Sequence, residues 1–118
     1  MDFNYFLFPT PESSYSLDRW DNELLFIPRG PSQHSNQDPS LPIPCLFLPY
    51  LPGSSKLIIY FHGNAEDLGQ AKDLLDDLRL TLKIHVLAIE YPGYGVYPGS
   101  PTAEGILDDA LTVWNYLI

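Results

Sequence analysis

Cysteine is nearly absent from the sequence. Cys45 stands alone, so no disulfide can form within the chain. A chain without a disulfide framework is typical of a reducing compartment, and we expect an intracellular protein, either cytoplasmic or membrane-peripheral. No histidine-containing signature of a cysteine nucleophile surrounds Cys45. Its apolar neighbours instead predict a small buried side chain in a strand.

Long hydrophobic runs and basic residues are also scarce. No apolar stretch approaches the roughly 20 residues of a membrane-spanning helix, and the apolar start, residues 1–9, has no basic segment typical of a signal peptide. The sequence has only 6 Lys and Arg residues but 15 Asp and Glu residues, which gives a net charge of −9. Such a surface repels phosphate backbones and anionic headgroups. We therefore expect no nucleic-acid partner, and membrane association has no support in the sequence.

The residues that are present suffice for one small packed domain, since 45% of the 118 residues are hydrophobic. Proline divides the chain. Nine of the 12 prolines fall within residues 1–52, and none lies between Gly53 and Tyr91. Because proline is excluded from helix interiors and central strands, the first part is predicted to be extended and the second part regular.

Strands and helices alternate in the second part of the chain. The patterns predict strands at Leu24–Ile27, Pro44–Pro49, Leu57–Phe61 and Ile84–Ile89. The prolines at both ends of the second strand favour an edge position, and the continuous apolar run of the third is typical of a strand buried on both faces. This order predicts an α/β fold with a mostly parallel sheet after a short antiparallel start.

Two helices are expected, one from Ala65 to about Thr81 and one beginning near Thr102. Asn64 would cap the first helix, and Glu66 and Asp67 would suit its positive end. The expected apolar residues of this helix are Leu68, Ala71, Leu74, Leu75 and Leu78, opposite a solvated acidic face of Asp73, Asp76 and Asp77. The second helix carries Ile106, Leu107, Ala110, Leu111, Trp114 and Leu117 on one face.

A His-Gly-Asn turn, residues 62–64, joins the strand Leu57–Phe61 to the first helix. Here the sequence resembles the α/β-hydrolase family. In that family a loop of this kind supplies a main-chain N–H of the oxyanion hole, which stabilises the charged intermediate of acyl transfer. The resemblance implies that Asn64 or Ala65 donates this N–H, that Gly63 permits the bend and that His62 orients the loop without acting as the base.

A second motif, Tyr-Pro-Gly-Tyr-Gly at residues 91–95, follows the strand Ile84–Ile89. It resembles the family turn often written D-Y-x-G-Y-G, with Glu90 in place of the common Asp, and Tyr91 would border the pocket. Together with residues 8–15 and 43–45, the two motifs are similar to one subgroup, the ABHD17-like depalmitoylases and BEM46-like serine hydrolases. This resemblance covers nearly the whole chain.

The family nucleophile motif, G-x-S-x-G, does not occur in the sequence. We therefore expect residues 24–118 to be the amino-terminal part of a hydrolase domain, preceded by an extension over residues 1–23 and ending before the nucleophile elbow. The Ser, Asp and His of the triad are expected beyond Ile118, so no catalytic residue is assigned within the chain, and whether the chain is an enzyme stays open. Without the next strand, Leu57–Phe61 would be an exposed apolar edge that favours self-association.

The resemblance implies a serine hydrolase acting on an ester or thioester, with a small acyl substrate or an acylated protein as partner and depalmitoylation as one such activity. The alternative is a non-catalytic binding or scaffolding fragment, or a truncated gene product. The motifs admit three other interpretations: an ordinary strand–helix turn capped by Asn64, a metal pair of His62 and Glu66, and a dinucleotide loop at Gly93 and Gly95. The last two lack a third ligand and a correctly placed third glycine. We expect no metal and no cofactor.

Overall fold

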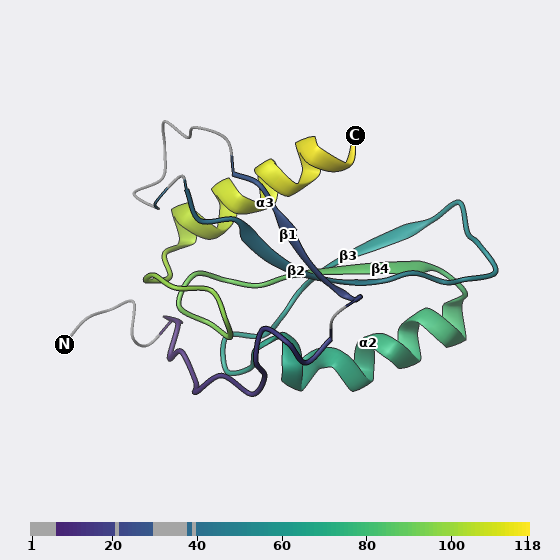
Figure 1. Ribbon diagram of the computed structural model, residues 1–118, viewed down its shortest axis with the longest axis horizontal. Helices are drawn as coiled ribbons and strands as arrows, with labels where there is room; N and C mark the ends of the chain where they lie inside the picture. Colours follow the sequence, from purple (N-terminus) through teal and green to yellow (C-terminus); the bar gives the residue numbers. More distant parts are fainter. Residues whose placement is uncertain (1–6, 21, 30–37, 39) are drawn as a thin grey trace.

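A computed structural model of the chain describes residues 7–20, 22–29, 38 and 40–118. Its centre is one four-stranded sheet with the order β1-β2-β4-β3, flanked by two helices (Figure 1). The strands pair antiparallel from β1 to β2 and from β2 to β4, and parallel from β4 to β3, so the expected α/β class is confirmed with a mixed sheet. The elements are β1 Leu24–Ile27, β2 Ile43–Leu48, β3 Leu57–Phe61, α2 Leu68–Leu82, β4 His85–Ile89 and α3 Ala103–Leu117.

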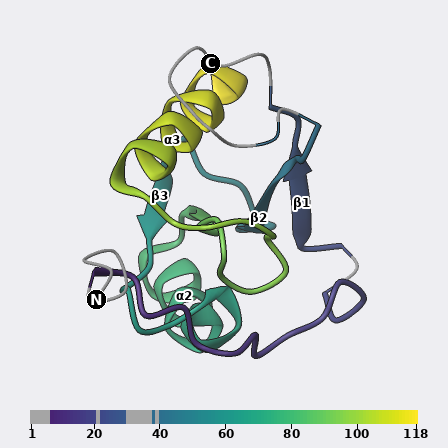
Figure 2. The same cartoon turned by 90° about the vertical axis from the view of Figure 1, so that its left-hand side faces the viewer.

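The two helices cover opposite faces of the sheet, as Figure 2 shows with the sheet seen between them. Each face has its own apolar cluster. On the α2 side, Leu68, Ala71 and Leu75 pack against β2 and β4. On the α3 side, Val113 is the buried apolar residue of the helix, and it packs against a cluster that includes Ile27, Ile43, Cys45, Leu87, Ile89 and Tyr97. Helix α2 therefore contributes more fully buried apolar side chains to the core than α3 does.

Strand β2 is internal, so the prediction of an edge position is wrong. It lies between β1 and β4, and Pro44 is paired with Phe26 of β1. Pro44 is tolerated because it lacks only the donor: its carbonyl still accepts the Glu90 N–H at 2.9 Å. Pro49 lies just beyond the end of the strand.

Strand β3 occupies the edge of the sheet next to β4. The prediction that it is buried on both faces is wrong, because Leu57 is 39% exposed and Phe61 is 49% exposed. Within the described residues no strand covers its outer side. The strand therefore presents an apolar edge with unpaired main-chain groups.

Helix α2 begins three residues later than expected, and its N-cap is Asp67 instead of Asn64. Asp67 and Gln70 form a capping box: each side chain accepts the other's main-chain N–H at 3.0 Å. The apolar stripe is as expected except for Leu74, which is 53% exposed. Two expected solvated acids, Asp73 and Asp77, are exposed, while Asp76 pairs with Lys72 and Arg79.

Helix α3 begins after Thr102 as expected, and the Thr102 hydroxyl accepts the Gly105 N–H at 2.9 Å. Its buried residues are Gly105, Asp109 and Val113. The apolar face expected from the sequence is turned outward instead, so that Leu107, Leu111, Trp114 and Leu117 are between 39% and 61% exposed.

A polar contact accounts for this rotation of α3. The Asp109 carboxylate lies 2.9 Å from the Arg29 guanidinium and accepts the Tyr97 hydroxyl at 2.7 Å. Burial outweighs the attraction of Arg29 and raises the pKa of Asp109 to about 7. The helix is therefore held to the sheet by one buried carboxyl group and Val113, while its apolar ridge faces outward.

Candidate functional site

The Glu90 carboxylate is the centre of the candidate site. It directly follows β4, is fully buried and accepts hydrogen bonds from four donors. Because three of these donors lie elsewhere in the chain, one side chain ties those three places to the end of β4. The donors are the Tyr15 hydroxyl at 2.5 Å, His62 Nε2 at 2.7 Å, the Leu68 N–H at 3.2 Å and the Tyr91 N–H at 3.2 Å.

His62 is the partner of Glu90 in a fully buried pair. Its second ring nitrogen, Nδ1, lies 2.7 Å from the Gly63 carbonyl oxygen. Both ring nitrogens are therefore engaged, Nε2 with a buried side chain and Nδ1 with the main chain of the turn. Because both nitrogens have partners inside the fold, the His62 ring holds the turn against Glu90.

Two tyrosines of the second motif enclose His62. The Tyr91 ring lies 3.9 Å from the His62 ring, centroid to centroid, and the Tyr94 ring lies 5.2 Å away. Their hydroxyls reach the main chain of the turn: Tyr91 donates to the His62 carbonyl at 2.7 Å and Tyr94 to the Asn64 carbonyl at 2.6 Å. Burial, reinforced by the nearby Glu90 charge, raises the pKa of Tyr91 to about 12, so it is a neutral donor.

The main-chain N–H groups of the turn fall into two groups. The Gly63 N–H is occupied, because it donates to the Glu66 carboxylate at 2.9 Å. For Asn64 and Ala65, in contrast, the N–H forms no hydrogen bond within the described part of the chain, and both residues are exposed. These are the two residues that the sequence predicts as donors to an oxyanion.

An open cavity of about 370 Å³ lies beside this turn. It has an apolar wall from α3, β3 and the amino-terminal segment, and a polar end formed by the turn. His62, Asn64 and Tyr91 line it, whereas Gly63 and Ala65 do not. The described residues that line it are Phe8, Phe61, His62, Asn64, Tyr91, Ala103, Ile106, Leu107 and Ala110.

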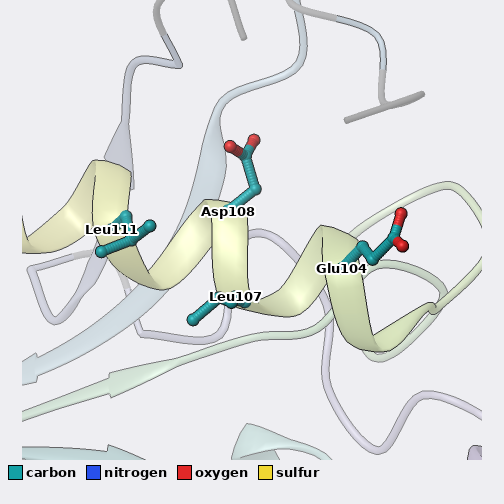
Figure 3. A pocket seen from close by; sticks show the side chains of 4 residues that line it. All are labelled: Glu104, Leu107, Asp108 and Leu111. Carbon is teal, nitrogen blue, oxygen red and sulfur yellow. The ribbon is translucent and has the colours of Figure 1, made fainter. Parts of the chain in front are cut away.

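A second hollow of about 330 Å³ lies on the outer surface of α3. Figure 3 shows its four lining residues, Glu104, Leu107, Asp108 and Leu111, all on successive turns of this one helix. Leu107 lines both hollows, so the apolar ridge of α3 is continuous with the wall of the larger cavity. Among the residues that the structure describes, only those of α3 line the second hollow, and we assign it no chemistry.

The last residue of the sequence, Ile118, lies apart from the candidate site. It is the C-cap of α3, its N–H donates to the Trp114 carbonyl at 3.2 Å, and it is 82% exposed. It lines neither the cavity beside the turn nor the hollow on α3. The expected position of the Ser, Asp and His of the triad, beyond Ile118, concerns residues outside this sequence and stays a prediction.

Other candidate chemistry finds no site in the part of the chain that the structure describes. No cluster of three or more His, Cys, Asp or Glu side chains is placed to bind a metal there, and both nitrogens of His62 already have partners. Cys45 is fully buried in β2, and burial raises the pKa of its thiol. None of the helices in the described ranges is both long and apolar enough to span a membrane.

Sequence reasoning misses the residues that hold the turn. It identifies Glu90 only as a replacement for Asp, and Tyr15 only as part of a resemblance. The usable signal is the glycine in the second motif: a side chain at Gly95 would collide with both the Glu90 carboxylate and the Tyr15 hydroxyl. A glycine that must remain small marks a place where buried groups crowd the main chain.

Comparison with known proteins supports the resemblance. Alpha/beta hydrolase domain-containing protein 17C of Xenopus tropicalis is 33% identical over 73 residues, which are 62% of this chain and 24% of that protein. Human alpha/beta hydrolase domain-containing protein 17B is 31% identical over 72 residues, 61% of this chain and 25% of its own length. Alpha/beta hydrolase domain-containing protein aho-3 of Caenorhabditis elegans is 28% identical over 125 aligned positions, 93% of this chain and 37% of its own length.

No family profile matches the chain, and no solved structure does. The chain spans between about a quarter and somewhat over a third of the length of these relatives. Its four-stranded sheet with two helices is a partial α/β-hydrolase fold in which the His-Gly-Asn turn follows β3. Fold, motifs and sequence similarity thus agree that this chain is a relative of the α/β-hydrolase domain-containing proteins and corresponds to a part of their length.

Proposed function

We propose that the chain forms the oxyanion-binding side of a serine hydrolase that cleaves an acyl ester or thioester. The observation that carries the proposal is the turn after β3. It offers two main-chain N–H groups, those of Asn64 and Ala65, that have no hydrogen-bond acceptor among the described residues, on a loop held by buried hydrogen bonds. Fixed donors of this kind stabilise the oxygen anion of a tetrahedral intermediate because they need no reorganisation during the reaction.

The cavity beside the turn fits the rest of an acyl substrate. Its apolar side chains, among them Phe8, Phe61 and Ile106, would contact the acyl chain, while the carbonyl oxygen lies at the polar end near Asn64. A serine oxygen would attack the carbonyl carbon, the alcohol or thiol would leave with a proton, and water would release the acid. These 118 residues contain no G-x-S-x-G, so the proposed reaction needs a nucleophile from outside them.

The finer assignment is to a protein S-acyl thioester in an intracellular, cytoplasmic or membrane-peripheral setting. It is supported by the resemblance of the two turn motifs to the depalmitoylase subgroup. The negative charge of −9 is compatible with a neutral acyl group and unfavourable for nucleic acid.

A second candidate is a non-catalytic binding module. The outward apolar ridge of α3 and the edge strand β3 support it, because Trp114, Leu107 and Phe61 are each about half exposed. Under this alternative the turn would be an ordinary strand–helix connection. Partner binding or self-association would then survive changes to the Ala65 N–H.

The test is fluorophosphonate labelling of the polypeptide that carries this sequence, captured from its source cells with an antibody against the chain. We expect one labelled serine, lost after heat denaturation. Ala65→Pro removes the main-chain N–H and should lower the labelling rate by about 10²–10³-fold, the effect of deleting an oxyanion donor. Ala65→Gly keeps the N–H and is the matched control. Absence of any labelled serine, or equal labelling of both variants, would reject the hydrolase proposal.

A further inference from the structure

The amino-terminal strap, defined here as residues 7–20, runs along the turn that carries the proposed oxyanion donors. It contacts this region at several points. The Leu7 carbonyl accepts the Asn64 side-chain amide at 2.7 Å, and Phe8 lines the cavity. Ser14 donates both its N–H, at 2.6 Å, and its hydroxyl, at 2.5 Å, to the Asp67 carboxylate that caps α2.

Tyr15 is the inner contact of the strap. It is only 7% exposed, stacks on Trp20 at 4.8 Å between ring centroids and donates its hydroxyl to Glu90. Burial and the neighbouring Glu90 charge raise the pKa of Tyr15, so the hydroxyl keeps its proton. The same Glu90 carboxylate binds His62 and the first N–H of α2, that of Leu68. Through Glu90, the Tyr15 hydroxyl is thus linked both to His62 at the start of the turn and to Leu68 just beyond its end.

Two glycines outside the strap make room for it. At Gly69, in the first turn of α2, an added Cβ would overlap the Ser14 hydroxyl and touch the Tyr15 ring. At Gly95, where φ is +54°, it would overlap both the Tyr15 hydroxyl and the Glu90 carboxylate. Glycine is unfavourable in a helix by about 1 kcal/mol relative to alanine, so its presence at position 69 has a compensating reason in the approach of the strap.

We infer that the strap is a positioning element for the turn at residues 62–66 and that Tyr15 is the positioning residue, acting through Glu90 and His62. Its effect on reaction rate rests on the proposed function, whereas its effect on the turn does not. Tyr15 does not touch the substrate. It supplies one of the donors that fix the direction of the Glu90 carboxylate, and that carboxylate fixes His62 and the start of α2.

The structural arm of the test is NMR spectroscopy of the full 118-residue chain with Tyr15→Phe, which removes only the hydroxyl. We expect shifted amide resonances at residues 62–66 and exchange of the Leu68 amide at least roughly tenfold faster, because a donor to a charged group is lost. The amides of β4 should be unchanged. Tyr116→Phe is the matched control, since Tyr116 is 55% exposed.

A second variant, Ser14→Ala, releases the strap from Asp67 and leaves Tyr15 intact. It should reproduce the shifts at residues 62–66 in weaker form if the strap acts as a unit. Unchanged resonances at residues 62–66 in the Tyr15 variant would overturn the inference, as would changes spread evenly over β4.

The kinetic arm uses the polypeptide captured for fluorophosphonate labelling, with a chromogenic acyl ester as substrate. Tyr15→Phe should lower kcat by about tenfold, less than loss of an oxyanion donor, with KM unchanged. If the resonances of residues 62–66 shift but fluorophosphonate labels no serine of the polypeptide, the hydrolase proposal is rejected and the inference about the strap stands. If the polypeptide is labelled but Tyr15→Phe changes neither kcat nor the resonances of residues 62–66, the inference about the strap is rejected and the hydrolase proposal stands.

Discussion

Gly69→Ala is the most informative single substitution, because its effect on helix propensity and its effect on the contact between α2 and the strap change the free energy of unfolding in opposite directions. In the helix alone, alanine is more favourable than glycine by about 1 kcal/mol. In the folded chain, the new Cβ would overlap the Ser14 hydroxyl and lie 3.0 Å from Tyr15 Cδ1. The strap must therefore move away from Asp67, or the helix must move away from the strap.

The magnitude follows from the bonds that this movement breaks. Ser14 makes two short hydrogen bonds to Asp67, at 2.6 and 2.5 Å, and a bond to a charged group contributes about 1.5–3 kcal/mol. Losing one of them outweighs the gain in helix propensity. We expect a net decrease of about 0.5–2 kcal/mol in the free energy of unfolding, against the roughly 5–15 kcal/mol typical of a domain.

Urea unfolding followed by circular dichroism measures this difference. Thr81→Ala is the control, since Thr81 is an exposed residue of the same helix and gains propensity without touching the strap. It should stabilise the chain by a few tenths of a kcal/mol. If Gly69→Ala stabilised the chain as Thr81→Ala does, the hydrogen bonds of Ser14 to Asp67 would contribute nothing measurable to the free energy of unfolding, and the account of the strap would be refuted.

Four further outcomes are expected. Because burial raises the pKa of Asp109 to about 7, the folded chain keeps a proton that the unfolded chain has lost, so the free energy of unfolding falls as pH rises from about 4 to 7; urea titrations at pH 5 and 8 should show this slope, and Asp109→Asn should flatten it. The Cys45 thiol, fully buried and with a raised pKa, should react with a disulfide reagent only after unfolding, and rapid reaction of the native chain would contradict its placement. Leu75→Ala should destabilise the chain by about 2–5 kcal/mol, whereas Leu80→Ala, at a residue 61% exposed, should change stability by less than about 0.5 kcal/mol in the same titration. The free chain should associate with rising concentration in sedimentation velocity, and Phe61→Lys at the β3 edge should weaken this; a monomer at all concentrations would exclude association through this edge.

The sequence predicts the central elements well because their signals are local. The apolar runs at Leu24–Ile27 and Leu57–Phe61 coincide with β1 and β3, and Thr102 caps α3 as its hydroxyl and position indicate. The start of α2 is harder to place because two capping residues compete. Asn64 and Asp67 both suit an N-cap, and only the partner Gln70, with its reciprocal bond, decides for Asp67.

Long-range contacts account for the remaining errors. The periodicity of α3 identifies its apolar face, but the pairing of Asp109 with Arg29 and Tyr97 turns the opposite side inward. The internal place of β2 depends on its pairing with β4, about 40 residues later in the chain, which no local pattern reveals. In the candidate site, the motif indicates His62 and Asn64, whereas the dependence on Glu90 and Tyr15 follows only from the fold.

The bond between Tyr15 and Glu90 joins residues 75 positions apart. Translation proceeds at about 5–20 residues per second, so Tyr15 is synthesised roughly 4–15 s before its acceptor. During that interval the strap can contact Asn64 and Asp67, which precede Glu90 in the chain, but Tyr15 has no carboxylate at position 90 to bind. The hydrogen bond between the strap and the Glu90 carboxylate can therefore form only after β4 has been made, and the loop held by that carboxylate gains this support only then.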